Sequence, residues 1–178
     1  MSTPENLPQL NICIIGLGLI GGSWVKALRE KGMQGCVIGF DRNLDSMQQA
    51  VELGIIDRYA STAREAVKGV DLVILSVPIL AIKDILLEIK PNLSSDTILT
   101  DVGSVKGNVV EAMREVFGDD KATFILGHPI AGSEKSGIKA SDSSLYENHT
   151  VILTPLENTD TKALATVRSL WEFVGASV

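Results

Sequence analysis

The chain has 178 residues, 45% of them hydrophobic, and its 22 acidic and 16 basic side chains give a formal net charge of -6. This length and this hydrophobic content fit one complete domain with one sizeable core. An acidic chain without a long single-sign run lacks the basic face that nucleic-acid binding requires. It also has no apolar segment of signal-peptide or membrane-span character. Composition therefore predicts a cytoplasmic protein whose partners are neither nucleic acid nor membrane.

The stretch 12–23 joins an apolar, β-branched run to the motif Gly16-x-Gly18-x-x-Gly21 and leads directly into a helical pattern. In such a strand–turn–helix unit the first glycine allows a sharp turn, the second lets the backbone approach a pyrophosphate, and the third lets the helix pack against the strand. The first helical N–H groups then face the phosphates. The motif predicts a dinucleotide site.

A second predicted strand, 36–41, strengthens this interpretation because it ends in Asp41, twenty residues after Gly21. A carboxylate at this place accepts hydrogen bonds from the ribose hydroxyls of NAD and repels the extra phosphate of NADP. The adjacent Arg42 is the residue type that accommodates that phosphate. We predict NAD as the cofactor, with NADP as the alternative.

The rest of the chain continues to alternate strands and helices, separated by short turns that glycine often marks. The predicted strands are 12–15, 36–41, 58–60, 71–77, 97–101, 123–130 and 150–154. The predicted helices are 24–31, 45–53, 62–67, 79–89, 109–117 and 161–173. Strand 71–77 is a nearly continuous apolar run, as expected for a strand buried on both faces of a parallel sheet. The pattern predicts an α/β fold with a doubly wound, mainly parallel sheet of the Rossmann type.

Two other segments stand out. The connection 131–148 is rich in small and polar residues and is longer than most loops inside a compact domain, which favours a functional role. The last residues, 174–178, resemble the beginning of another strand. We therefore expect residues 1–178 to form the dinucleotide-binding domain of a longer parent protein.

Ligands of open α/β sheets bind at the carboxyl ends of the strands. Polar residues and glycines gather at these predicted strand ends. Strand ends are also where a polar residue costs the least free energy of folding, so this pattern alone does not prove a functional role. The candidate cofactor-binding residues are Gly16, Gly18, Leu19, Ile20, Gly21, Asp41, Arg42, Ser76, Val77, Pro78, Asp101 and Gly103.

His128 is the candidate acid–base residue, since it ends a predicted buried strand and leads into the long loop. A histidine beside a nicotinamide can accept the hydroxyl proton of an alcohol while hydride leaves its carbon. His149 lies at the start of a strand and is predicted to be exposed. The spacing of the histidines and cysteines predicts no metal site, and Ser104 has no adjacent base, which disfavours a hydrolase triad. Cys13 and Cys36 lie in apolar strands and are assigned no chemistry.

Three motifs in this order resemble the nucleotide-binding domain of the prephenate/arogenate dehydrogenases of tyrosine biosynthesis. They are Gly-Leu-Gly-Leu-Ile-Gly-Gly-Ser at 16–23, Asp-Val-Gly-Ser-Val-Lys at 101–106 and Gly-His-Pro-Ile-Ala-Gly-Ser-Glu-Lys-Ser-Gly at 127–137. The resemblance implies NAD(P)-dependent oxidative decarboxylation, in which hydride leaves the ring carbon that bears the 4-hydroxyl group. It also implies that His128 is catalytic and holds that hydroxyl, with Ser104 as its polar partner, and that Ser133 and Glu134 line the substrate pocket.

The resemblance further implies a homodimer formed through a C-terminal helical domain that also contributes substrate-binding groups. The present chain contains no such domain, so we expect it to bind nucleotide and to turn over substrate poorly by itself. Whether the substrate is prephenate or arogenate stays open. The alternatives are another Rossmann enzyme, such as a β-hydroxyacid dehydrogenase or a pyrroline-carboxylate reductase, and a non-catalytic dinucleotide-binding module.

Overall fold

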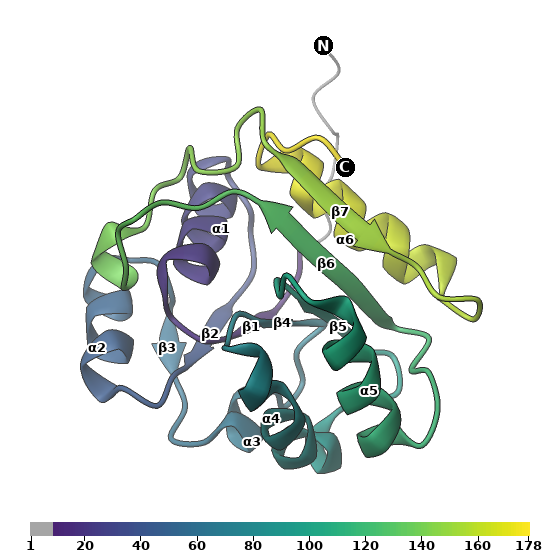
Figure 1. Ribbon diagram of the computed structural model, residues 1–178. Coiled ribbons are helices and arrows are strands. Elements are labelled where there is room, and N and C mark those ends of the chain that lie inside the picture. The colour runs from purple at the N-terminus through teal and green to yellow at the C-terminus, as the bar shows by residue number, and fades with distance from the viewer. Residues whose placement is uncertain (1–8) are drawn as a thin grey trace.

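The computed structural model describes residues 9–178 and contains one seven-stranded sheet with the strand order β3-β2-β1-β4-β5-β6-β7 (Figure 1). The strands are β1 (Ile12–Ile15), β2 (Val37–Phe40), β3 (Arg58–Tyr59), β4 (Leu72–Leu75), β5 (Ile98–Asp101), β6 (Phe124–Ile130) and β7 (Thr150–Thr154). The helices are α1 (Leu19–Glu30), α2 (Leu44–Glu52), α3 (Ala63–Ala66), α4 (Ile82–Ile89), α5 (Lys106–Phe117) and α6 (Thr161–Phe173). Single 3-10 turns lie at η1 (Ile79–Ala81), η2 (Lys90–Asn92) and η3 (Ile138–Ala140).

The sheet is parallel from β3 to β6, and only β7 runs antiparallel to its neighbour β6. The chain starts in the middle at β1, builds outward through β2 and β3, and then crosses over to β4 on the other side. The crevice at such a reversal of strand order is where ligands of doubly wound sheets bind. The predicted fold class is confirmed.

Each face of the sheet carries its own hydrophobic core. Helices α1, α2 and α6 cover one face, and α3, α4 and α5 cover the other (Figure 1). Alternate residues of β1 enter different cores: Ile12 and Ile14 enter the first, whereas Cys13 and Ile15 enter the second. Burial on both faces explains why the parallel strands are continuous apolar runs.

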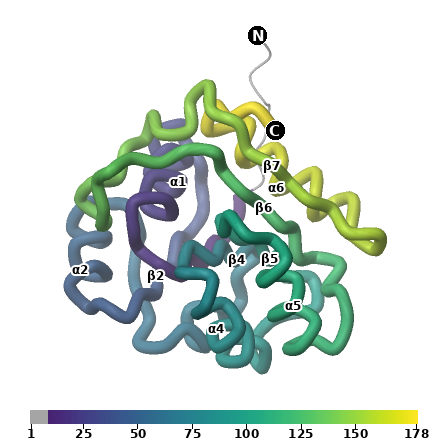
Figure 2. Tube along the Cα trace, in the orientation of Figure 1, coloured from purple at the N-terminus to yellow at the C-terminus, as the bar shows by residue number. Residues whose placement is uncertain are grey.

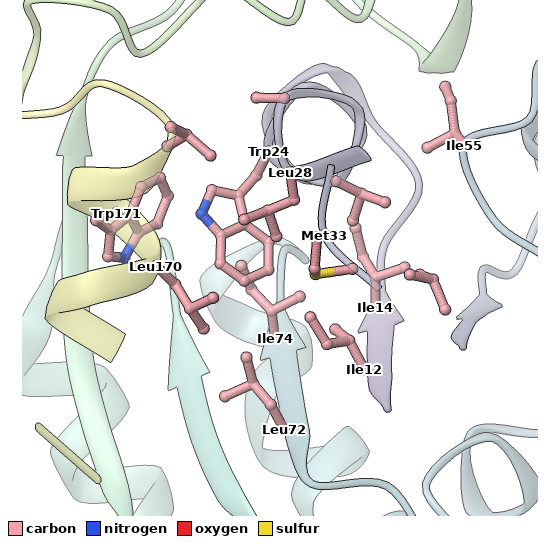
Figure 3. Close-up of a cluster of buried hydrophobic side chains, with 14 of the residues drawn as sticks. Ile12, Ile14, Trp24, Leu28, Met33, Ile55, Leu72, Ile74, Leu170 and Trp171 are labelled. Carbon is pink, nitrogen blue, oxygen red and sulfur yellow. The ribbon is translucent and has the colours of Figure 1, made fainter. Parts of the chain in front are cut away.

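Aromatic side chains join α1 to α6 in the first core. The ring centroids of Trp24 and Trp171 lie 5.4 Å apart, and the edge of Tyr146 meets Trp171 with centroids 5.0 Å apart. Figure 3 shows Trp24 and Trp171 beside each other over Leu72 and Ile74 of β4. All three aromatic residues are fully buried, so this contact fixes both helices on the sheet.

The predicted strands and helices are all present, but two helices begin earlier than predicted. Helix α1 starts at Leu19 rather than 24, so Gly21 and Gly22 are helical, and α5 starts at Lys106 rather than 109. Both first turns lack the apolar spacing that marks a helix in sequence, because they lie at the carboxyl edge of the sheet instead of over the core. The predicted helix 79–89 begins as the 3-10 turn η1 and becomes α4.

The long connection after β6 runs beside α1 to α2, where it forms η3, and then returns to β7 (Figures 1 and 2). At the end of the chain, Ser177 makes a single parallel bridge to Thr150 of β7, in line with the extended pattern predicted there. Within residues 9–178, no helix has both the length and the apolar character to cross a membrane.

Candidate active site

The glycine motif forms a tight turn between β1 and α1. Gly16 has a φ of +97°, and a Cβ atom there would lie 2.2 Å from the backbone oxygen of Ser76. A Cβ on Gly21 would lie 2.7 Å from Cδ1 of Ile14, so this glycine allows α1 to pack against β1. At Gly18 no atom lies within 4 Å of the Cβ position, which leaves the backbone open to a ligand. The geometry at Gly16 and Gly21 fits the turn and packing roles that their spacing predicts, and the phosphate-binding role of Gly18 stays a prediction.

The amino end of α1 is open to an anion. Gly18 is the N-cap residue, and no side chain caps the helix. Among residues 9–178, no acceptor is found for the N–H groups of Leu19, Ile20 and Gly21. N–H groups without partners at the start of a helix, together with the helix dipole, favour a negatively charged ligand such as a phosphate group.

Asp41 links the end of β2 to the glycine motif. Its Oδ2 accepts a hydrogen bond from the Leu17 N–H at 2.8 Å, and its Oδ1 accepts one from the Asn43 N–H at 2.8 Å. Each carboxylate oxygen retains acceptor capacity for a ribose hydroxyl. Arg42, next in sequence, is exposed.

A cavity of about 550 Å³ lies at the crevice where the strand order reverses. Leu80, which is 89% exposed, forms one apolar edge, and Asp84 adds a second carboxylate to that of Asp41. The predicted cofactor-binding residues that line the cavity are Gly16, Gly18, Asp41, Arg42, Ser76, Val77 and Pro78. The structure thus brings the first, second and fourth strand ends together as predicted.

A second hollow, of about 360 Å³, connects the glycine motif with the long loop. Leu19 and Ile20 line it from α1, and Ser133 lines it from the loop. Ser133 also accepts a hydrogen bond from the Lys135 N–H at 3.0 Å. Glu134 is exposed and does not line this hollow, so of the two predicted loop residues only Ser133 reaches the glycine motif.

His128 and Ser104 lie farther along the same sheet edge. His128 is half-buried within β6, opposite Ile152 of β7, and two more residues of the strand follow it, in agreement with the predicted range 123–130. Ser104 is exposed between β5 and α5. Neither residue lines the two hollows described above. His149 is exposed, as predicted.

Asp101, predicted to bind the cofactor, is completely buried and forms an ion pair with Lys106. Burial raises the pKa of the Asp101 carboxyl group, and burial likewise lowers the pKa of Lys106. The Asp101 carboxylate also accepts hydrogen bonds from the N–H groups of Gly103 and Gly127. The Asp101 carboxylate therefore contacts other residues of the protein and does not line the nucleotide cavity.

Sequence reasoning missed the residues that hold the long loop on α1. The Tyr146 hydroxyl donates a hydrogen bond to the Ile20 carbonyl at 2.5 Å, and the Asp142 N–H donates one to Oγ of Ser23 at 2.9 Å. Ser23 is a polar residue on the buried face of an apolar helix, which is the one signal that could have indicated a partner.

A parallel sheet with a glycine turn, an uncapped helix and an acidic strand end defines a Rossmann-type dinucleotide-binding domain. The family model described as prephenate dehydrogenase, nucleotide-binding domain, matches residues 24–178. The chain belongs to this family.

Individual relatives agree with the family match. A cyclohexadienyl dehydrogenase of Zymomonas mobilis is 33% identical over 168 residues, which cover 94% of this chain and 57% of the relative. A prephenate dehydrogenase from A. aeolicus, solved with hydroxyphenyl propionate and NAD+, is 41% identical with a TM-score of 0.89, covering 98% of this chain and 60% of that one. An arogenate dehydrogenase from Synechocystis is 34% identical with a TM-score of 0.85, covering 94% and 58%. The chain thus spans somewhat under two thirds of these relatives' lengths.

Proposed function

We propose that this chain is the nucleotide-binding domain of an NAD-dependent dehydrogenase that converts prephenate or arogenate by oxidative decarboxylation in tyrosine biosynthesis. The observation that carries the proposal is the cavity between the glycine motif and Asp41 in a chain of this family. The A. aeolicus relative binds NAD+, and the relatives act on prephenate, arogenate or, as the Zymomonas name says, cyclohexadienyl compounds.

The residues present fit NAD. The open N–H groups at the start of α1 would hold the pyrophosphate, and the Asp41 carboxylate would accept the ribose hydroxyls. Asp84, which lines the same cavity, adds negative charge that disfavours the additional phosphate of NADP. When bound, the nicotinamide supplies the acceptor for a hydride.

The protein's own residues act on the substrate hydroxyl. His128 accepts a hydrogen bond from the 4-hydroxyl group and relieves the positive charge that develops there as hydride leaves the same carbon. The bond between the opposite ring carbon and its carboxylate breaks, its electron pair completes the aromatic ring, and CO2 leaves. The phenol product keeps the hydroxyl proton. Ser104 is the polar partner of His128, and Ser133 and Glu134 stay predicted substrate-binding residues.

The reaction is tested by NADH formation with prephenate and then with arogenate, measured on this chain and on a form extended past Val178. We expect NADH with at least one of the two substrates, and His128→Asn should lower kcat by about 10²–10⁴-fold. NADH formation from a β-hydroxyacid instead would favour the rival enzyme class. Nucleotide binding without turnover in either form would favour a non-catalytic module.

The cofactor is tested separately by titrating NAD and NADP into the wild type and Asp41→Ala. We expect the wild type to prefer NAD and the variant to lose that preference. Unchanged NAD affinity in the variant would contradict the role of Asp41. A homodimer, a helical domain C-terminal to this one and a cytoplasmic location stay predictions.

A further inference from the structure

The backbone ladder between β5 and β6 ends before the candidate catalytic histidine. Its last register pair is Thr100 with Ile125. Two residues later, at Gly127, hydrogen bonds from side chains replace those of the backbone ladder. Oδ1 of Asp101 accepts a hydrogen bond from the Gly127 N–H at 3.2 Å, and Nζ of Lys106 donates one to the Gly127 carbonyl at 2.6 Å. The Asp101–Lys106 ion pair thus satisfies both backbone polar groups of Gly127 at the point where β6 leaves β5.

The same carboxylate also holds the segment after β5. Oδ2 of Asp101 accepts the Gly103 N–H at 2.9 Å and contacts Lys106. Both glycines approach Asp101 closely: an added Cβ would lie 3.0 Å from Oδ2 at Gly103 and 2.8 Å from the Asp101 backbone oxygen at Gly127. Ser104 follows the first of these glycines, and His128 follows the second.

A buried ion pair is a poor device for stability alone. The desolvation of two charges offsets much of their attraction, and a well-packed apolar pair often stabilises a fold equally well. The side chain of Asp101 is fully buried, with 0% of its surface exposed, and 17% of the Lys106 side-chain surface is exposed. What the ion pair provides, and an apolar pair cannot, is directional hydrogen bonding to two separate backbone segments.

We propose that Asp101 and Lys106 are positioning residues that fix Ser104 and His128 relative to each other through the backbones of Gly103 and Gly127. This inference rests on the proposed function for the roles of Ser104 and His128, and it assigns the two charged residues a task of their own. Asp101 acts through the neighbouring glycines instead of touching the cofactor with its carboxylate.

The test removes both charges together, because loss of one partner alone leaves an unpaired buried charge. The variant is Asp101→Asn combined with Lys106→Met, which keeps the volumes similar. The matched control is Asp57→Asn combined with Arg29→Met. That ion pair also joins a carboxylate to a strand N–H, since Oδ2 of Asp57 accepts the Val37 N–H at 2.7 Å, but it lies at the amino end of β2 and is partly exposed.

The first measurement uses NMR on this chain, with the imidazole signals of His128 as the reporter and those of exposed His149 as the internal reference. We expect the Asp101/Lys106 double variant to fold cooperatively and to bind NAD+ within about twofold of the wild type, because its contacts do not include the nucleotide cavity. The His128 signals should shift while those of His149 stay unchanged. The control should move neither. A folded double variant with unchanged His128 signals would overturn the proposal. A double variant that fails to fold would also overturn it, because the ion pair would then be required for stability.

The second measurement is kinetic, in the form of the protein that turns over prephenate or arogenate. A misplacement of the order of 1 Å costs about 10²-fold in rate, so kcat should fall by that order while KM for NAD+ stays unchanged. Unchanged kcat would overturn the proposal. If the wild type turns over neither substrate while the His128 signals still respond to the double variant, the proposed function fails and the positioning role stands.

Discussion

Replacing Gly22 by alanine tests the contact between α1 and the long loop after β6. Gly22 lies inside α1, and a Cβ atom there would lie 2.3 Å from Oγ of Ser141 and 2.5 Å from Cδ1 of Ile138. The Ser141 hydroxyl donates to the Ile138 carbonyl at 2.6 Å, so it cannot rotate away without losing that hydrogen bond. The loop must therefore shift to admit the methyl group.

The expected change in stability is the difference of two effects. Overpacking costs about 1–3 kcal/mol, whereas alanine in place of glycine inside a helix gains about 1 kcal/mol. The net effect for Gly22→Ala is a loss of about 0–2 kcal/mol. Gly107→Ala is the matched control, because Gly107 is also helical and no atom lies within 4 Å of its Cβ position.

Urea and thermal unfolding of the two variants measure this difference. Gly107→Ala should gain up to about 1 kcal/mol, so the two variants should differ by about 2 kcal/mol. For a domain of this size, that corresponds to roughly 4–8 °C in Tm. If Gly22→Ala were stabilised as much as Gly107→Ala, the loop would not pack on α1 in the way described.

Three shorter predictions concern single side chains. Tyr146→Phe removes the hydrogen bond to the Ile20 carbonyl and should cost about 0.5–1.5 kcal/mol in urea unfolding; an unchanged midpoint would contradict that bond. Hydrogen bonds from Ser144 lower the pKa of Asp142, so its contribution to stability is present above the ordinary value of 3.8 and is lost as the pH falls through the lowered pKa. The stability margin of the wild type over Asp142→Asn should therefore vanish in acid, and a margin independent of pH would refute this. Burial raises the pKa of the Cys13 thiol, so thiol reagents should label it only after unfolding, and rapid labelling of the native protein would show that the strand is accessible.

Much of the fold was predictable because local signals and packing agree. The apolar runs of the parallel strands reflect burial on both faces, and the bounds predicted for β7 and α6 match the structure. Glycines at helix ends, such as Gly32 and Gly118, have positive φ values, as a helix stop requires. The sequence predicts starts of α1 and α5 that are too late, because the residues of their first turns lie at the edge of the sheet and lack the apolar spacing of a helix that packs on a core.

The cofactor half of the site was predictable for a similar reason. Its glycines and Asp41 lie within one strand–helix–strand unit, so their spacing in sequence reflects their spacing in space. The contacts of the long loop could not be read in this way, because Tyr146 reaches Ile20 across 126 positions. The role of Asp101 was equally hidden: its partner Gly127 is 26 positions away and contributes only a backbone N–H, which leaves no trace in residue type.

The two halves of the site are built from separate contacts, and this has a measurable consequence. The Asp41 carboxylate accepts hydrogen bonds from the backbones of Leu17 and Asn43. The Asp101–Lys106 ion pair instead makes hydrogen bonds with the backbones of Gly103 and Gly127. Asp41 directly follows β2 and Asp101 ends β5, and these strands are separated by β1 and β4, so they lie about 14 Å apart at the usual strand spacing. Free-energy changes at sites that share no partner and lie this far apart add within about 0.5 kcal/mol. We therefore expect Asp41→Ala to weaken NAD binding equally in the wild type and in the Asp101/Lys106 double variant. A coupling beyond that margin in a double-mutant cycle would show that the ion pair reaches the nucleotide cavity.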